Sequence, residues 1–432
     1  MKSKKILLLE KILRLMAIAV LKKYNPQVVG ITGSVGKTSA KEAAYLVLAS
    51  KFRARKNIKN YNNEIGIPLT IIGAESGNKS FLKWLKVFFK WLAVIIFPCE
   101  YPEVLALEMG VDKPGDMGYL LDFVPVKVGV ITSISPVHLE YFKSIDHIAK
   151  EKGALIKNLP EGGRAILNAD DEKTAALAGE TKAKVITYGF SEKARVRASD
   201  AIYISENNQP EGISFKLNYE GKSIPVRLRR ILASHQICAA LAAASAGIAF
   251  KINLVDIAAS LEQFSSPPGR MNLIPGIKES LIIDDTYNSS PKAAIAALET
   301  LDNLKAPRKI AVLGDMLELG ADEESGHKAA ARKMFEMGVG LFAAVGERMK
   351  ITAGELERLG YPKEKIFWFD NPSEAGNKLR EIITLKDIIL VKGSQSMRME
   401  KAVEKIMAEP AKARILLCRQ SAEWWKKPYV KP

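Results

Sequence analysis

Cysteine is scarce in this sequence of 432 residues. Its three cysteines lie far apart without C-x-x-C spacing, which argues against both a disulfide framework and a zinc site. They are Cys99, Cys238 and Cys418. Internal repeats and low-complexity tracts are also missing. With 47% hydrophobic and 26% charged residues the composition is that of a globular protein. At roughly 150 residues per domain, the length predicts about two to three domains.

Acidic residues are in deficit, with 48 Asp and Glu against 64 Lys and Arg, so the formal net charge is +16. Such an excess is compatible with nucleic acid, a membrane surface or an anionic substrate, and charge alone does not choose among them. The basic residues cluster in residues 1–23, in residues 51–59 and in the tail after Glu409. Because these clusters lack interleaved aromatic residues and any known binding motif, we expect no nucleic acid partner.

The N-terminal residues are not expected to be a signal peptide. Residues 1–25 are apolar and basic, but Glu10, Lys11 and Arg14 interrupt the apolar run and no A-x-A-like cleavage site follows. We expect a basic amphipathic surface helix here, and a cytoplasmic protein.

A long uncharged apolar run is missing too. The most apolar segment, residues 81–97 (FLKWLKVFFKWLAVIIF), contains three lysines and is too charged and short for a comfortable membrane span. Lys83, Lys86 and Lys90 share one face of a helix. Two interpretations stay open. The helix packs on a sheet or against a partner, or it lies in a membrane interface with its tryptophans and lysines at the headgroup level.

What the sequence does contain is an alternation of apolar runs and helical stretches. The first run, Val28–Thr32, leads through a glycine turn into a helix from about Thr38 to Ser50. This alternation predicts an α/β fold with mostly parallel sheets. Further strands are expected at 104–107, 128–132, 165–167, 185–187, 281–284, 310–313, 341–345, 366–369 and 388–391.

A Ser-Ser-Pro-Pro-Gly stretch at residues 265–269 is the clearest linker signal and predicts a domain boundary near residue 268. We therefore expect a P-loop central domain over residues 26–267. A Rossmann-like α/β C-terminal domain with a basic tail follows over residues 268–432.

A glycine-rich loop lies between the first predicted strand and helix. Its sequence is TGSVGKTS, residues 32–39. Glycines let successive backbone N–H groups and the helix N-terminus point at phosphate oxygens. Lys37 would bridge the terminal phosphates of a nucleotide, and the Thr38 hydroxyl would reach Mg²⁺. The loop is a shorter G-x-x-G-K-T variant, because Ile31 stands where the general pattern has glycine.

Two candidate metal ligands follow predicted strands. Glu108 comes directly after residues 104–107, and His138 lies shortly after residues 128–132. Carboxyl ends of strands are where α/β sheets assemble ligand sites. From the residues alone, two explanations are equally good for each. Glu108 is either a metal ligand or a solvated charge at the end of a strand, and His138 is either a metal ligand or a helix cap.

Ten stretches in the same order resemble the Mur ligase family, ATP-dependent enzymes that form amide bonds in peptidoglycan precursors. They are ITGSVGKTSAKE, NYNNEIGIPLT, LEMGVDKPGDM, ITSISPVHLEYF, EKGALI, ILNADD, GRMN, IIDDTYNSSP, VLGDMLELG and VKGSQSMRMEK. DDTYN followed by GDMLELG is similar to the branch that adds D-alanyl-D-alanine to UDP-N-acetylmuramoyl-tripeptide. The resemblance implies these two substrates, ATP, Mg²⁺ and an acyl-phosphate intermediate.

The resemblance also implies roles for residues in the central domain. The ATP loop matches Gly33, Ser34, Val35, Gly36, Lys37, Thr38 and Ser39. Glu108 and His138 match magnesium ligands, which favours the metal interpretation for both. Lys152 matches a lysine that family members carbamylate, which turns a cation into a carboxylate-like ligand for a second Mg²⁺.

In the C-terminal domain, Arg270 matches an arginine that meets the nucleotide phosphates, and Asn288 matches a residue near the adenine or ribose. The residues with implied catalytic roles are Lys37, His138, Lys152 and Arg270. Those implied to contact substrate are Asn62, Asn63, Glu64, Asp285, Tyr287, Lys392, Ser394 and Arg398.

The sequence departs from the family in two places. Only 29 residues precede Gly30, too few for the usual uridine-binding N-terminal domain, so we do not expect that domain here. His235 is kept from a family motif, but Gln236 and Ala239 replace its two asparagines. An alternative function therefore stays open, namely a membrane-surface Mur-like module that acts on a different, lipid-linked acceptor.

Overall fold

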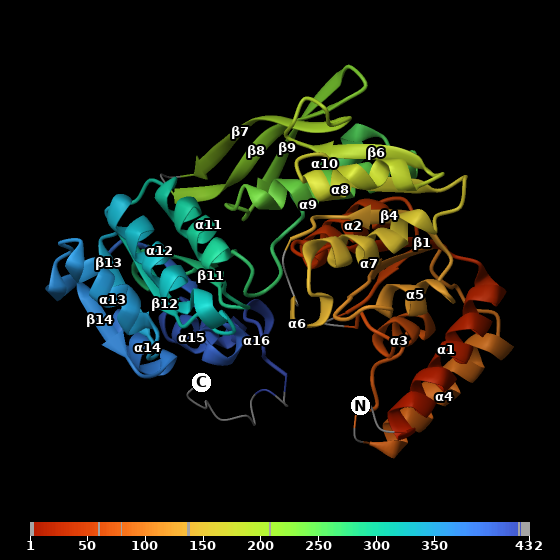
Figure 1. Cartoon of the computed structure of the whole chain (residues 1–432), viewed down its shortest axis with the longest axis horizontal. Coiled ribbons are helices and arrows are strands. Elements are labelled where there is room, and N and C mark those ends of the chain that lie inside the picture. Colours follow the sequence, from red (N-terminus) through yellow and green to blue (C-terminus); the bar gives the residue numbers. More distant parts are fainter. Residues whose placement is uncertain are drawn as a thin grey trace. The chain divides into compact units, whose positions relative to one another are not determined.

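The computed structural model describes residues 4–58, 61–78, 80–135, 139–206, 209–421 and 424. The chain forms two compact units (Figure 1). Unit 1 comprises residues 1–201, 214–227 and 235–264, and unit 2 comprises residues 202–213, 228–234 and 265–432.

The first sheet has nine strands in the order β2-β3-β1-β4-β5-β6-β7-β8-β9. All pairs from β2 to β7 are parallel. The strands are β1 Gln27–Thr32, β2 Ala54–Lys56, β3 Val104–Glu108, β4 Val126–Ile131, β5 Arg164–Asn168, β6 Lys184–Gly189, β7 Val196–Glu206, β8 Gln209–Tyr219 and β9 Lys222–Arg229. The sequence predicted β1 and β3 to β6, whereas β2 and β7 to β9 are additional.

Ten helices of unit 1 belong to the described residues. They are α1 Lys4–Tyr24, α2 Lys37–Ala49, α3 Gly66–Ile72, α4 Phe81–Ile96, α5 Asp116–Leu121, α6 Leu139–Phe142, α7 Ile145–Lys157, α8 Glu172–Ala176, α9 His235–Ala249 and α10 Leu254–Glu262. Caps explain where several of them begin. Ser144 accepts a hydrogen bond from the N–H of His147 at the start of α7, and Asn253 accepts one from Asp256 at the start of α10.

The second sheet lies in unit 2, with strand order β10-β11-β15-β12-β13-β14. β10 is antiparallel to β11, and the remaining pairs are parallel. The strands are β10 Asn272–Pro275, β11 Leu281–Asp285, β12 Lys309–Gly314, β13 Leu341–Val345, β14 Ile366–Phe369 and β15 Ile388–Lys392. The predicted bounds of β13 and β14 are confirmed, and the α/β class holds for both sheets.

Helices cover both faces of this sheet. They are α11 Pro291–Asp302, α12 Glu323–Glu336, α13 Met349–Arg358, α14 Pro372–Ile382, α15 Glu400–Ile406 and α16 Ala413–Leu416. Alternate strand residues enter two separate cores, as the period of two in a strand requires. Ile283 and Leu390 pack with α11, α12 and α13, while Ile282 and Ile389 pack with α14, α15 and α16. Burial on both faces explains why these strands read as continuous apolar runs.

The predicted helix at residues 81–97 forms as α4, but its main neighbours are the helices α1 and α3 rather than the sheet (Figure 1). Its tryptophans do not face outward. Trp84 and Trp91 are half-buried and donate their indole N–H groups to the carbonyls of Asn78 and Met16, both at 3.0 Å. Within the described ranges, no helix has the length and apolar character needed to cross a membrane.

Candidate active site

The loop between β1 and α2 requires glycine at two positions. Gly33 has φ +148° and Gly36 has φ +83°, both in the region that side chains disfavour. A Cβ atom on Gly33 would lie 2.0 Å from the hydroxyl of Thr132. The backbone can therefore take this path only with glycine at these positions, as a phosphate-binding loop needs.

The segment after β4 holds this loop in place. The N–H of Ser34 donates to the carbonyl of Ser133 (2.7 Å), and the Thr132 hydroxyl donates to the carbonyl of Val35 (2.5 Å). The Ser34 hydroxyl also donates to the carbonyl of Ser135 (2.9 Å). Thr132, Ser133 and Ser135 were missed from the sequence, because nothing in a short polar stretch shows which loop it contacts.

Lys37 begins α2 and reaches back over the loop. Its ammonium group donates to the carbonyls of Gly33 (2.7 Å) and Ser34 (3.2 Å). Thr38 and Ser39 follow in the first turn of α2, with Thr38 half-buried and Ser39 buried. The Lys37 cation and the N-terminus of α2 therefore concentrate positive charge at the loop, which favours an anionic ligand.

Glu108 lies at the carboxyl end of β3, beside Ile31 of β1, and is 5% exposed. Two asparagines hold it. Asn62 donates to the carboxylate of Glu108 at 3.1 Å. Asn57 binds the backbone of Glu108 twice, accepting from its N–H and donating to its carbonyl, both at 2.9 Å. The carboxylate is thus fixed next to the phosphate loop.

Behind this clamp is a buried lysine that the sequence did not single out. Lys41 is 1% exposed and donates to the carbonyl of Asn57 at 2.9 Å. Its charge is balanced by Glu42 at 2.8 Å. Read as a sequence, Lys41 looks like a solvated helix residue, and only tertiary packing reveals its contact with Asn57.

Lys152 is buried in α7, with 1% of its surface exposed. Burial, assisted by the positive charge of Lys37, lowers its pKa from 10.5 to about 7. Asp112 and Glu151 oppose this shift. A substantial fraction of the Lys152 amine is therefore neutral near pH 7, the form that can react with carbon dioxide.

The three residues of the NNE stretch occupy different positions. Asn62 contacts Glu108, as described. Asn63 is exposed and lies in the turn before α3, where its side-chain oxygen accepts from the N–H groups of Ile65 (3.3 Å) and Gly66 (3.0 Å). Glu64 is half-buried, and its charge adds to the burial that raises the pKa of Asp116.

His138 lies outside the described residues. Among the residues that the structure does describe, no three His, Cys, Asp or Glu side chains come together in a group that could hold a metal ion. His235 is exposed at the first position of α9. The carbonyl oxygen of the Gln236 side chain beside it is buried and has no hydrogen-bond partner in the described part of the chain.

A second set of predicted residues comes together at the carboxyl ends of β11 and β15 in unit 2. The Lys392 ammonium group binds the Asp285 carboxylate at 2.5 Å and donates to the carbonyl of Asn288 at 3.0 Å. The Arg270 guanidinium lies over the ring of Tyr287, 4.1 Å from its centroid. These five residues therefore form one cluster.

Beneath the cluster, Asp284 is fully buried and accepts hydrogen bonds from Gly269 N–H (2.9 Å) and the Thr286 hydroxyl (2.6 Å). Burial raises the pKa of Asp284 to about 7, and the hydrogen bonds oppose the rise. The carboxyl group fixes both the Gly269 turn before Arg270 and the loop before Tyr287.

The last predicted residues are buried. The Ser394 hydroxyl accepts from the N–H of Leu317 at 2.8 Å. Arg398 donates to Glu400 at 2.6 Å, and Arg419 contacts the other carboxylate oxygen of Glu400 at 2.7 Å. Arg419 also donates to the carbonyl of Tyr287 at 3.0 Å. Arg419, which the sequence did not single out, thus connects the Arg398 region to the Tyr287 loop.

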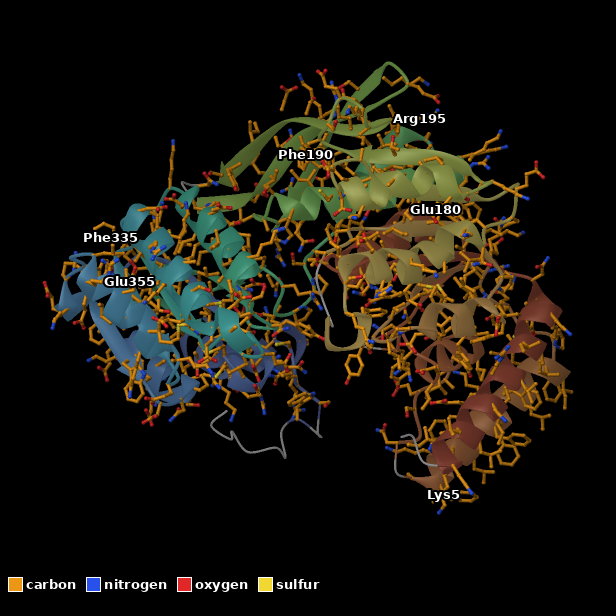
Figure 2. The ribbon with its side chains drawn as sticks, in the orientation of Figure 1. Lys5, Glu180, Phe190, Arg195, Phe335 and Glu355 are labelled. Carbon is orange, nitrogen blue, oxygen red and sulfur yellow. The ribbon has the colours of Figure 1, made fainter. Side chains whose placement is uncertain are left out.

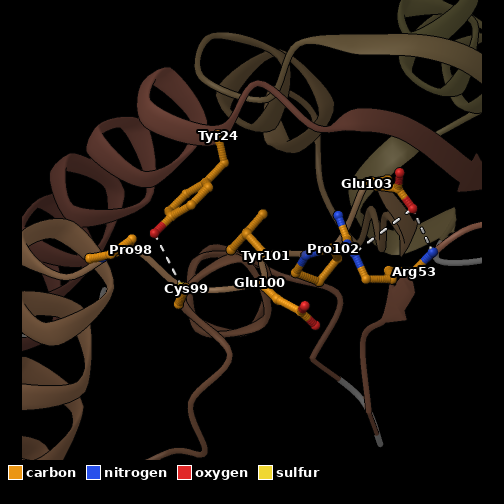
Figure 3. Close-up of a pocket in the computed structure, with 8 residues that line it drawn as sticks. All are labelled: Tyr24, Arg53, Pro98, Cys99, Glu100, Tyr101, Pro102 and Glu103. Carbon is orange, nitrogen blue, oxygen red and sulfur yellow. Dashed lines mark hydrogen bonds and ion pairs between the residues drawn. The ribbon is translucent and has the colours of Figure 1, made fainter.

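A pocket of about 480 Å³ lies elsewhere in unit 1 (Figure 3). It is lined by Tyr24, Arg53, Pro98, Cys99, Glu100, Tyr101, Pro102 and Glu103. Arg53 and Glu103 directly precede β2 and β3, whereas the phosphate loop follows β1. Because these strands are parallel, the pocket lies at their amino ends, whereas the loop lies at their carboxyl ends.

Two models of protein families match the chain. The Mur ligase middle domain matches residues 93–247, and the Mur ligase glutamate ligase domain matches residues 269–395. The chain belongs to the Mur ligase family. The middle-domain match includes Glu108 and Lys152 but begins after the phosphate loop. The match to the second domain includes Arg270 and Lys392 but ends before Arg398.

Curated relatives within this family have similar sequences over most of their length. The UDP-N-acetylmuramoyl-tripeptide–D-alanyl-D-alanine ligase of Bacillus subtilis is 28% identical over 401 residues, 92% of this chain and 79% of the relative. The ligase of the same name from Escherichia coli is 28% identical over 388 residues, 88% of this chain and 76% of the relative.

Solved Mur ligase structures resemble the fold. A crystal structure of MurF from Acinetobacter baumannii has a TM-score of 0.75 and 26% identity, covering 91% of this chain and 79% of that one. MurF from Thermotoga maritima in complex with ADP has a TM-score of 0.72 and 24% identity, covering 92% of this chain and 83% of that one. The latter, at this identity, supports the fold alone.

Proposed function

We propose that this chain is an ATP-dependent ligase of peptidoglycan precursor synthesis. It joins the terminal carboxylate of UDP-N-acetylmuramoyl-tripeptide to the amine of D-alanyl-D-alanine. The names of the relatives from Bacillus subtilis and Escherichia coli support this pair of substrates. The reaction passes through an acyl phosphate, because a carboxylate must be activated before an amine can displace one of its oxygens.

The observation that carries the proposal is the environment of Lys152. A buried lysine with a pKa near 7 beside a phosphate loop has no evident structural purpose, since burying its charge is costly. We propose that its neutral amine adds carbon dioxide and loses a proton. The resulting carbamate is an anionic oxygen ligand and relieves the repulsion from Lys37.

The residues around the phosphate loop suit a magnesium nucleotide. The glycine path at Gly33 and the cation of Lys37 fit the phosphates, and the fixed carboxylate of Glu108 and the hydroxyl of Thr38 are oxygen ligands that Mg²⁺ prefers. His138 and carbamylated Lys152 complete the proposed set. Bound Mg²⁺ would neutralise phosphate charge. Lys37 offsets the charge that remains as the phosphoryl group moves.

Residues 268–432 serve the second half of the reaction in this proposal. Arg270 meets nucleotide phosphates, and Asn288 lies near the adenine or ribose. Lys392, Ser394 and Arg398 hold the incoming dipeptide. Residues 26–267 bind ATP and the muramoyl peptide, through Asn62, Asn63 and Glu64.

The same proposal locates the ligase in the cytoplasm, in peripheral contact with the inner face of the membrane. A second candidate function keeps the ATP chemistry but acts on a lipid-linked acceptor. The exposed apolar side chains of α4 favour it, because they suit an enzyme that works at a lipid surface.

The test is phosphate release from ATP and Mg²⁺, with UDP-N-acetylmuramoyl-tripeptide and D-alanyl-D-alanine added separately and together. The proposal predicts release that requires both substrates, with product mass equal to their condensation. Phosphate release that does not require both substrates together would contradict the proposal. Release only with a lipid-linked muramoyl peptide would favour the second candidate.

A further inference from the structure

Large apolar side chains are exposed in one part of the molecule far more than elsewhere. Of the 22 that are exposed in the described residues, 12 belong to α1, α4 and the adjoining Phe97. Those in α1 are Ile6, Leu7, Leu8, Ile12 and Leu15, and those around α4 are Phe81, Leu82, Leu85, Phe88, Phe89, Ile96 and Phe97. We call these side chains the α1–α4 surface.

The exposure follows the period of a helix. In α4, Val87 is buried on the inner face of the helix. Leu85 and Phe89, two positions before and after it, are exposed on the outer face. Phe81 and Ile96 are exposed as well. Phe81 is 78% exposed and Phe89 57%. A helix normally turns such a face to a core, so this face is available for a partner.

Contacts on the inner side hold α4 against α1. The Trp91 indole donates to the Met16 carbonyl, as noted above. Lys23 donates to the carbonyls of Val94 (3.0 Å) and Ile95 (2.9 Å), and the Tyr24 hydroxyl donates to Val94 (2.7 Å). The outward face is therefore presented by a fixed pair of helices, side by side in Figure 1.

Positive charge accompanies the apolar face. α1 and α4 contain nine Lys and Arg residues and one acidic residue, Glu10, which is buried. The formal charge of the pair is thus +8, half of the +16 of the whole sequence. Lys83 and Lys86 are exposed beside the apolar face of α4, and Figure 2 shows Lys5 at the N-terminal end of α1.

We propose that the α1–α4 surface binds an anionic lipid bilayer, with both helices lying in the plane of the interface. Apolar side chains would enter the acyl boundary while lysines meet acidic headgroups. The 16 residues of α4 span about 24 Å at 1.5 Å per residue, less than the roughly 30 Å of hydrocarbon in a bilayer.

Charge favours a lipid surface over a second copy of this chain. A two-fold contact would bring the same lysines of both copies together, and like charges repel. An anionic bilayer instead supplies both an apolar layer and opposite charge. This inference deepens the membrane part of the proposed function and does not require ligase activity.

The experiment is co-sedimentation of the full chain with vesicles of phosphatidylcholine alone or with about 30 mol% phosphatidylglycerol. The proposal predicts at least about tenfold stronger partitioning onto the anionic vesicles, reduced by high salt. K83E combined with K86E should weaken this binding at least about tenfold. F81S combined with F89S should weaken it similarly at unchanged net charge.

Two matched controls change the same chemistry elsewhere. K363E with K365E alters the net charge equally at exposed positions of unit 2, and V255S with I415S removes exposed apolar side chains. Both should bind vesicles as the unchanged chain does. Phosphate release in lipid-free buffer, retained by all four variants, separates lost binding from misfolding and from failure of the proposed reaction.

Three outcomes would overturn the inference. One is equal binding to neutral and anionic vesicles. Another is binding that the α1–α4 variants and the controls lose to the same extent. The third is a concentration-dependent dimer in lipid-free buffer that F81S with F89S abolishes, which would make a second copy the occupant.

Discussion

The phosphate-loop end of the first sheet and the α1–α4 surface break the usual distribution of side chains in opposite ways. At the loop, charged and polar residues are buried, namely Lys41, Glu108 and Lys152. On the α1–α4 surface, phenylalanines and leucines are exposed. Buried charge and exposed apolar area both cost free energy in the isolated chain, so each indicates a ligand.

The two regions also differ in how they are held. Many hydrogen bonds fix the loop, Glu108 and Asn57 in one geometry, which suits chemistry on a small anion. The helices that carry the α1–α4 surface are held together on their inner side, and the apolar side chains of the surface are exposed on the outer side. Such a surface suits a partner without defined geometry, such as a bilayer.

The largest effect is expected at the loop. Lys37→Ala should lower the rate of phosphate release by about 10³-fold or more, because the charge of the moving phosphoryl group loses its cation. The free energy of unfolding should change little, since the side chain is half-buried. Steady-state kinetics with both substrates measures the rate.

Lys216→Ala, which removes an exposed lysine of β8, is the control and should leave the rate unchanged. A Lys37→Ala variant with near-normal turnover would contradict the proposed ATP site. It would leave the α1–α4 surface unaffected, and vesicle binding should persist in it.

Asn57→Ala should lower the free energy of unfolding by about 3 kcal/mol, because the buried N–H and carbonyl of Glu108 lose their partner. Activity should also fall, since Glu108 is no longer fixed. Urea unfolding followed by circular dichroism measures the stability. Asn158→Ala, at the exposed end of α7, is the matched control and should cost less than about 1 kcal/mol. Equal costs for the two variants would show that the clamp is unimportant.

Lys152 gives a pH dependence with a definite sign. Its folded pKa of about 7 lies below the value of 10.5 for the exposed side chain. Between these values the unfolded chain binds a proton that the folded chain does not, so the contribution of Lys152 to stability rises with pH. The slope is up to about 1.4 kcal/mol per pH unit between pH 7 and pH 10, and it vanishes below pH 7.

Lys152→Met removes this titration. The difference in free energy of unfolding between the two proteins, measured in buffer free of carbon dioxide, should therefore change with pH by that slope. A difference independent of pH from 7 to 10 would mean that Lys152 keeps its ordinary pKa.

The smallest effect is expected between α1 and α4. Trp91→Phe keeps an aromatic ring but removes the donor to Met16, so the free energy of unfolding should fall by about 1 kcal/mol. Amide hydrogen exchange in α4 should become faster while phosphate release stays unchanged. Trp368→Phe removes a similar bond to Gly346 in unit 2 and should leave exchange in α4 as it was. Faster exchange in both variants, or in neither, would contradict the assigned role of Trp91.

The sequence predicted the buried parallel strands well, because they are apolar on both faces. The run at Leu341–Val345 coincides with the buried strand β13, and the apolar run at Ile366–Phe369 coincides with β14, a partly exposed strand at the edge of the sheet. It missed β7 to β9, where charged and apolar residues mix, as in VRASDAIYISE of β7. It also left open whether α4 packs on a sheet, packs against a partner or lies in a membrane interface, since an apolar helix gives no sign of which element it contacts.

For the candidate site, motifs identified residues whose chemistry is local, such as Gly33 and Lys37. Asn57, Lys41 and Arg419 were missed because their importance comes from contacts between distant parts of the chain. For Lys152, the sequence supplied a resemblance, and the structure added the burial that lowers its pKa.

The most direct test of the central claim follows one oxygen atom. UDP-N-acetylmuramoyl-tripeptide with ¹⁸O in its terminal carboxylate is incubated with ATP, Mg²⁺ and D-alanyl-D-alanine, and the released phosphate is analysed by mass spectrometry. Activation of the carboxylate as an acyl phosphate predicts one ¹⁸O atom in each phosphate released with product. Unlabelled phosphate would mean that water, not the peptide carboxylate, accepts the phosphoryl group, and would contradict the proposed ligase.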